Sequence, residues 1–254
     1  MQISKSLNFI FMMIIISILV ISNVFADENN NTSDEASSPE VEEILVTANR
    51  TEQSISDVSQ AVQALSGDDL QDLQITDFEQ MIDLIPGAVQ NSSISQGSNV
   101  YSIRGVASAE TDGDATIGYY LDNFAFSIPG RPYAPVTDIY DTERVEVLRG
   151  PSGTLYGLGS LGGTIKVITK DPVLGEFEGS FKATLADIDD GDSSHTGDLM
   201  VNIPLSENAA LRGVLSIKDI GGWAEIIPSN QTDGNPYDGI TGRLKLLVEP
   251  SEDL

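Results

Sequence analysis

The strongest constraint on the fold is an alternation of apolar and polar residues that begins near Phe177 and continues almost to the end of the 254-residue chain. Successive side chains of a β-strand point to opposite faces, so the pattern predicts antiparallel strands with one apolar and one polar face. It fits a soluble sandwich and a lipid-facing barrel equally well. The alternating runs cover residues 177–185, 211–217 and 240–248, with a poorer match at 199–205.

The connections between these runs favour the barrel. They are of medium length at 187–196, short at 204–208 and long at 221–239, and outer-membrane barrels alternate short turns with longer loops. Residues 173–254 therefore hold about four strands, whereas the smallest barrels need ~8 and plugged ones ~22. We expect an incomplete barrel and hence a truncated chain.

A glycine-rich stretch at 143–172 precedes this region and predicts two strands, 144–148 and 164–169, joined by a turn. Its glycines at 157, 159 and 162 match the G-x-G-x-x-G spacing of a dinucleotide site. Such a site needs a helix after the glycines, and a β-branched run follows here instead. No Lys-Ser/Thr pair follows either, which excludes a P-loop.

Composition excludes several functional classes. The chain has 13 Lys plus Arg against 39 Asp plus Glu, a formal net charge of −26, and such a field repels nucleic acid. It has no Cys, and its single histidine, His195, falls in a run that we interpret as a polar turn. These residues offer no catalytic triad, metal site or cofactor site, so we expect no enzyme.

The N-terminal residues are predicted to be a signal peptide and a tether rather than part of the folded domain. Residues 1–26 are predicted to be a signal peptide, with Lys5 before an apolar stretch at 7–21 and small residues before Asp27. The alternative is a membrane anchor, but the apolar stretch is shorter than the ~20 residues that a spanning helix needs. Residues 27–50 are acidic and polar at first, and we expect a flexible tether.

Residues 51–172 are predicted to form an α+β unit. Helical spacing follows Ser66 and Thr76, and the second site, Thr76 with Glu79, is predicted to be a capping box. Phe78, Met81, Ile82 and Ile85 would form one apolar helix face. Strands are expected at 88–94, 100–104 and 117–121.

Four ordered motifs resemble the plug domain of TonB-dependent outer-membrane receptors. They are the run 42–48, Ile85-Pro86-Gly87, Ser102-Ile103-Arg104-Gly105 and the stretch 143–172. The likeness covers about residues 41–254 and implies an α+β plug followed by the start of an antiparallel transmembrane β-barrel. One departure is Lys166, where the family usually carries Asn; the sequence assigns it no contact.

The resemblance implies energised uptake of a scarce nutrient, most simply a ferric siderophore or similar iron complex, across the outer membrane of a Gram-negative bacterium. The alternative is a secreted periplasmic binding or interaction module made of the plug alone. The partners would be TonB, outer-membrane lipid and the small-molecule substrate. The TonB box would add a strand to TonB, although the same residues could simply be the first strand of the domain. It would comprise Glu42, Glu43, Ile44, Leu45, Val46 and Thr47.

Two further groups of residues are expected at functional contacts. Arg104 and Arg149 each precede a glycine after a strand; they could be solvated, but inside a barrel they would need carboxylate partners on the wall. The resemblance places those partners outside this chain. Phe126, Arg131 and Tyr133 lie in a proline-rich loop and are predicted to face the incoming substrate.

Overall fold

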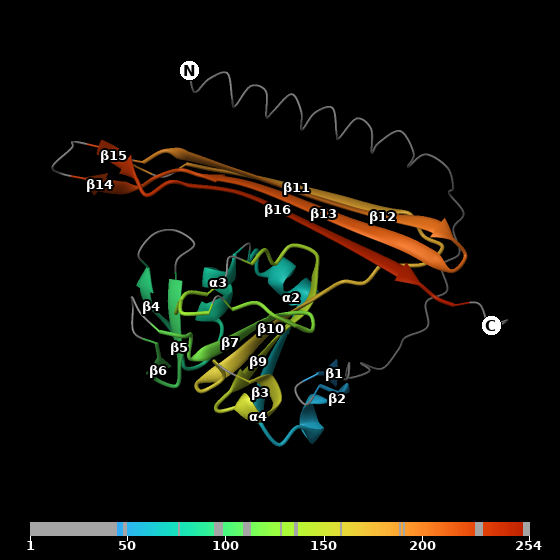
Figure 1. The fold of residues 1–254 in the computed structure, drawn as a ribbon. Helices are drawn as coiled ribbons and strands as arrows, with labels where there is room; N and C mark the ends of the chain where they lie inside the picture. The colour runs from blue at the N-terminus through green and yellow to red at the C-terminus, as the bar shows by residue number, and fades with distance from the viewer. Residues whose placement is uncertain are drawn as a thin grey trace, which may run out of the picture.

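The structure is a computed structural model in which a globular unit lies against one face of a long, gently curved sheet (Figure 1). The globular unit spans residues 45–171, and the long sheet follows it in the chain. The structure describes residues 45–47, 50–75, 77–93, 99–108, 113–127, 129–134, 137–157, 159–187, 189, 191–226 and 231–250. The predicted signal peptide and most of the predicted tether lie outside the described residues.

A five-stranded sheet forms the centre of the globular unit, in the order β3-β9-β10-β7-β8. Strands β7 and β10 are parallel, and the other neighbours are antiparallel. The β-branched residues of β9 and β10 pack one face into the main core, which explains why the glycine-rich stretch reads as two strands. The bounds are β3 Ala61–Ser66, β7 Ile117–Leu121, β8 Phe124–Ala125, β9 Thr142–Arg149 and β10 Gly163–Thr169.

A second, three-stranded sheet in the order β4-β5-β6 and two short helices cover this core. The helix face predicted at Phe78, Met81, Ile82 and Ile85 is confirmed, since all four side chains are buried. The bounds are α2 Gly67–Asp72, α3 Phe78–Asp83, β4 Ala88–Ser93, β5 Asn99–Ile103 and β6 Val106–Ala107; the smaller elements are β1 Leu45–Val46, β2 Gln53–Ser54, the 3-10 helix η1 Ile55–Asp57 and α4 Gly153–Tyr156.

The helix caps differ from the prediction. The capping box belongs to α2, where Ser66 accepts from the backbone N–H of Asp69 and the Asp69 carboxylate accepts from that of Ser66. In α3 the N-cap is Asp77, whose carboxylate accepts from the backbone N–H of Gln80 at 2.8 Å. Thr76 itself lies outside the described residues. The helix α3 begins at Phe78, one residue later than the predicted box requires, and Asp77 is the residue that caps it.

The long sheet contains four antiparallel strands in the order β11-β12-β13-β16. Strand β12 extends through His195, which pairs with Leu185 and Asp219, so the predicted turn at His195 is wrong. The connection between β13 and β16 carries a small hairpin, β14 and β15, at one end of the sheet (Figure 1). The bounds are β11 Glu178–Asp187, β12 Ser193–Ser206, β13 Ala209–Ile220, β14 Ala224–Ile226, β15 Gln231–Gly234 and β16 Tyr237–Val248.

The two faces of the long sheet are inverted relative to a soluble protein. The polar face is turned toward the globular unit, and Arg212, Ser216 and Asn202 on it are buried. The apolar face is left uncovered, with Leu185 77%, Ile240 76% and Leu244 71% exposed. No described helix is long and apolar enough to cross a membrane.

Candidate functional site

The end of the predicted TonB box is seated on the globular unit. Leu45 and Val46 form β1, which pairs with β2, and Val46 is fully buried. This is the position of a first strand of the domain, the alternative that the sequence also allows. Glu42, Glu43 and Ile44 lie outside the described residues. Pairing of the segment with a partner protein stays a prediction.

The site on which residues 45–47 rest, here called the seat, lies on the face of the central sheet opposite the main core. Val46 packs there in a small apolar cluster with Tyr120, Leu148 and Tyr156. Beside the cluster, the side chains of Glu146 and Lys166 come from paired positions of β9 and β10. The backbone N–H of Thr47 donates to Glu146 Oε1 at 2.8 Å, and Lys166 Nζ donates to Thr47 Oγ1 at 2.7 Å.

The charges of the seat compensate one another. Burial lowers the pKa of Lys166, and the neighbouring Glu146 carboxylate opposes that shift. Arg144 Nε donates to Glu146 Oε1 at 2.9 Å. Burial, and next the Glu146 carboxylate, raise the pKa of Tyr156 to about 12, so its hydroxyl keeps its proton at neutral pH and acts as a donor. The sequence assigned Lys166 no contact, and the structure corrects this: Lys166 touches the predicted TonB box.

A second polar contact joins the globular unit to the long sheet. Asp141, just before β9, binds the guanidinium of Arg212 on β13 in bidentate fashion, at 2.7 Å and 2.9 Å. Both side chains are 5% exposed, so the pair is shielded from water. Arg212 also donates to Glu178 at 3.1 Å, and Arg243 donates to the backbone oxygens of Tyr140 at 3.1 Å and Asp141 at 3.0 Å.

Lys245 extends this contact to the end of the central sheet. Its ammonium donates to the backbone oxygen of Thr169 at 2.9 Å and to Asp171 at 3.0 Å, and lies 3.4 Å from Asp122. Asn202 fixes the linker by bonding both backbone groups of Val173. Cations of the long sheet therefore meet carboxylates of the globular unit. Sequence reasoning missed this polarity, although the inward-facing Arg and Lys of the alternating strands signalled it.

The two arginines predicted at plug–barrel contacts lie away from these cations. Arg104 is exposed, with a backbone φ of 53°, while Arg149 is half-buried and its Nη1 is 3.5 Å from the backbone oxygen of Pro86. Neither forms an ion pair with any residue that the structure describes, and the buried Arg149 Nε has no hydrogen-bond partner there. Carboxylate partners on a barrel wall stay a prediction.

The residues predicted to face substrate lie on the surface. Phe126 and Arg131 are exposed, and Tyr133 is half-buried. Phe126 is positioned by its backbone N–H, which donates to the backbone oxygen of Tyr119 at 2.8 Å. A guanidinium and aromatic rings at the surface can bind an anionic or aromatic ligand.

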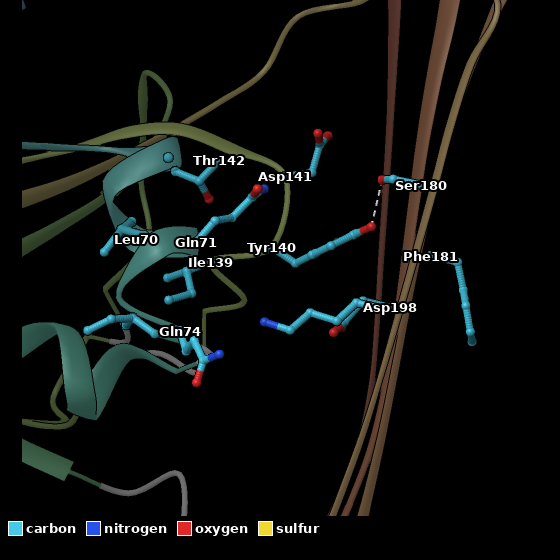
Figure 2. A pocket seen from close by; sticks show the side chains of 13 residues that line it. Leu70, Gln71, Gln74, Ile139, Tyr140, Asp141, Thr142, Ser180, Phe181 and Asp198 are labelled. Carbon is cyan, nitrogen blue, oxygen red and sulfur yellow. Dashed lines mark hydrogen bonds between the residues drawn. The ribbon is translucent and has the colours of Figure 1, made fainter.

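A cavity of about 340 Å³ separates α2 from the long sheet (Figure 2). The hydroxyl of Tyr140 crosses it to Ser180 on β11, at 2.7 Å, and Phe181 points away from it. Burial raises the pKa of Tyr140. Polar groups from both sides line the cavity, among them Gln71, Gln74 and Asp198. Among the described residues, no cluster of three or more His, Cys, Asp or Glu could hold a metal ion.

Comparison with known proteins agrees with this architecture. Residues 54–164 match the family model of the TonB-dependent receptor plug domain. The chain is 30% identical over 206 residues to the metal-pseudopaline receptor CntO of Pseudomonas aeruginosa, which covers 80% of this chain and 25% of that protein. It is 30% identical over 132 residues to the pesticin receptor of Yersinia pestis, covering 51% of this chain and 19% of that protein.

A solved structure shows the same fold. The ferric yersiniabactin uptake receptor FyuA from Yersinia pestis superposes with a TM-score of 0.62 at 22% identity, over 78% of this chain and 30% of that one. The matched curated relatives are thus receptors of which this chain spans a quarter or less. Through its plug domain and the strands that follow, the chain belongs with the TonB-dependent receptors.

Proposed function

We propose that this chain forms the plug and the first wall strands of an outer-membrane receptor that takes up a metal chelate, most simply a ferric siderophore or similar iron complex. The long sheet would be the beginning of an antiparallel transmembrane β-barrel in a Gram-negative outer membrane. Substrate would bind from outside, and TonB would supply energy from the periplasmic side. The domain limits proposed are 1–26, 27–50, 51–172 and 173–254.

One observation carries this proposal: the long sheet covers its polar face with the globular unit and leaves its apolar face bare. In water that arrangement would be unfavourable, because burying apolar surface is the main driving force of folding. In a bilayer it is favourable, since lipid covers the apolar face and the plug satisfies the polar one. A soluble periplasmic module would leave the same apolar face exposed to water, which disfavours that alternative.

Replacing Leu244 with lysine tests the lipid contact. Leu244 is 71% exposed near the middle of β16, where a lipid-facing lysine costs about 2–4 kcal/mol. We expect Leu244→Lys in the full-length receptor to reduce the amount recovered in the outer-membrane fraction severalfold. Thr241→Lys, on the opposite face of the same strand, is the matched control and should fractionate as the parent does. Equal recovery of both variants, or a soluble periplasmic product, would contradict membrane insertion.

The proposed substrate class has two supports. CntO is a metal-pseudopaline receptor and FyuA a ferric yersiniabactin receptor, so relatives handle metal chelates. The exposed Phe126 and Arg131 suit an anionic chelate with aromatic groups. Iron-limited growth of a receptor-deletion strain, complemented with the full-length gene and given a panel of ferric siderophores, identifies the cargo. Growth on none of them, with growth on cobalamin or a glycan instead, would replace this substrate class.

Deleting residues 42–47 tests the coupling role. The deletion should abolish energised uptake of the bound chelate and leave binding to whole cells unchanged, because the strand that pairs with TonB is lost. Deletion of six tether residues, 30–35, is the length-matched control and should keep uptake. Uptake and binding are measured with the radiolabelled metal at 37 °C and on ice. Normal uptake by the 42–47 deletion refutes the coupling role.

A further inference from the structure

The seat of Thr47 contains two charged side chains that water does not reach. Glu146 is 0% exposed and Lys166 5% exposed, and both lie on the side of the sheet that the N-terminal segment covers. Buried charges are unfavourable unless hydrogen bonds and opposite charges compensate them. Thr47 supplies part of that compensation, because it sits between the ammonium and the carboxylate and bonds to both. The other described partners are Arg144, which donates to Glu146 at 2.9 Å, and Asn123, whose Oδ1 accepts from Lys166 at 3.4 Å.

All polar groups of Thr47 take part. Its N–H and hydroxyl face Glu146 at 2.8 Å and 3.1 Å, and its hydroxyl accepts from Lys166 at 2.7 Å. Its backbone oxygen accepts from the hydroxyl of Tyr156 at 3.1 Å and from the backbone N–H of Arg50 at 2.9 Å. The neighbouring Val46 is fully buried, whereas Leu45 is 45% exposed. Two residues therefore hold the segment, one through apolar contact and one through charge-assisted hydrogen bonds.

We propose that the Glu146–Lys166 pair is a latch that determines how often the segment 45–47 leaves the globular unit. Departure of Thr47 removes a partner from each of two buried charges, so both charges hold the segment in place. Lys166 holds the segment through its ammonium, which donates to Thr47 Oγ1 at 2.7 Å. Lys166 is thus a positioning residue for the segment. The consequence for energy coupling rests on the proposed function; the latch itself does not.

The latch is tested with a cysteine reporter in the seat. Residues 1–254 have no Cys, so Val46→Cys introduces the one thiol of this part of the receptor, of nearly the same size as valine and buried while the segment is seated. The receptor without Val46→Cys gives the background labelling. Its rate of reaction with a maleimide is measured on the full-length receptor in outer membranes from a strain without TonB. Adding Lys166→Met should raise the labelling rate about tenfold, the value of one charge-assisted hydrogen bond. Glu146→Gln should raise it at least as much.

Two further variants serve as controls for the labelling experiment. Lys170→Met removes a lysine near the end of the same strand whose only described ion pair, with Asp68 at 3.7 Å, is solvent-exposed; its labelling rate should stay within about twofold of the parent. Lys166→Asn keeps a polar side chain but removes the ammonium that donates to Thr47, so it should fold and still label faster. Protease resistance of the receptor reports folding of each variant. A parental labelling rate in folded Lys166→Asn and Lys166→Met overturns the latch, as does equal acceleration by Lys170→Met.

The same variants separate the latch from the proposed function. Labelling without TonB measures only how often the segment leaves its seat. Uptake by cells with TonB measures what the segment does afterwards. Faster labelling of Lys166→Met supports the latch even if the 42–47 deletion takes up metal normally, a result that refutes only the coupling role. An unchanged labelling rate refutes the latch whatever the uptake assay gives.

Discussion

Replacing Arg212 with methionine is expected to loosen the globular unit from the long sheet by about 3–5 kcal/mol, the cost of leaving a buried charge without its partner. Methionine keeps the apolar stem but removes both hydrogen bonds to Asp141, which is 5% exposed. Arg243 remains 3.5 Å from that carboxylate and compensates part of the loss. The measurement is the urea midpoint of the globular unit in the full-length receptor, followed by pulsed hydrogen exchange of β9 and β10.

Two control variants make the Arg212 result specific. Lys182→Met also removes an inward-facing cation of the long sheet, but Lys182 forms no ion pair with any described residue and should cost under about 1 kcal/mol. The double variant Asp141→Asn with Arg212→Met removes the stranded charge and should recover part of the midpoint. If Arg212→Met unfolds at the same urea concentration as Lys182→Met, the contact does not hold the two parts together.

Replacing Gly163 with alanine is expected to destabilise the globular unit by about 1–3 kcal/mol, because the added methyl group overpacks the core. A Cβ at this position would lie 2.5 Å from the backbone oxygen of Leu148 and 2.9 Å from Ile103 Cδ1. The oxygen belongs to the neighbouring strand β9, so it cannot move without breaking the ladder. The expected result is a lower midpoint in the urea measurement described for Arg212→Met, and reduced recovery of folded receptor.

Gly153 is the matched control for Gly163. It belongs to the same glycine-rich stretch, has no positive φ, and a Cβ there meets nothing within 4 Å. Gly153→Ala should therefore be neutral or stabilise the unit by about 0.4–1 kcal/mol through the unfolded chain. Equal midpoints for the two alanine variants would show that the close approach at Gly163 is not a constraint on folding.

The sequence predicted the elements whose pattern is local. The strand expected at 117–121 has these bounds, and β9, β10 and α3 fall where β-branched runs and helical spacing placed them. The period-two runs after Phe177 predicted four strands and the side chains on each face. The sequence pattern failed at His195, which lies inside β12 rather than in a turn, and at the start of α3, which Asp77 caps.

Local sequence patterns could not predict the two polar contacts, one between Thr47 and Glu146 and one between Asp141 and Arg212. Thr47 and Glu146 are 99 residues apart in the chain, and Asp141 and Arg212 are 71 apart. Lys166 looked like an isolated departure from a motif because nothing near it in the chain bonds to it. Arg104 and Arg149 attracted attention through their motifs, yet the ion pairs that the structure describes between the two parts use carboxylates of the globular unit instead.

The sequence by itself determined where the chain forms strands, because residue alternation with period two assigns each side chain to one of two faces. The alternation alone fits a sandwich or a barrel, and only the lengths of the connections favoured the barrel. Only the tertiary structure decided that the polar face is covered and the apolar face bare, and that Thr47 rests between two buried charges. These depend on contacts between distant segments, whose cost in chain entropy only the whole packed core offsets.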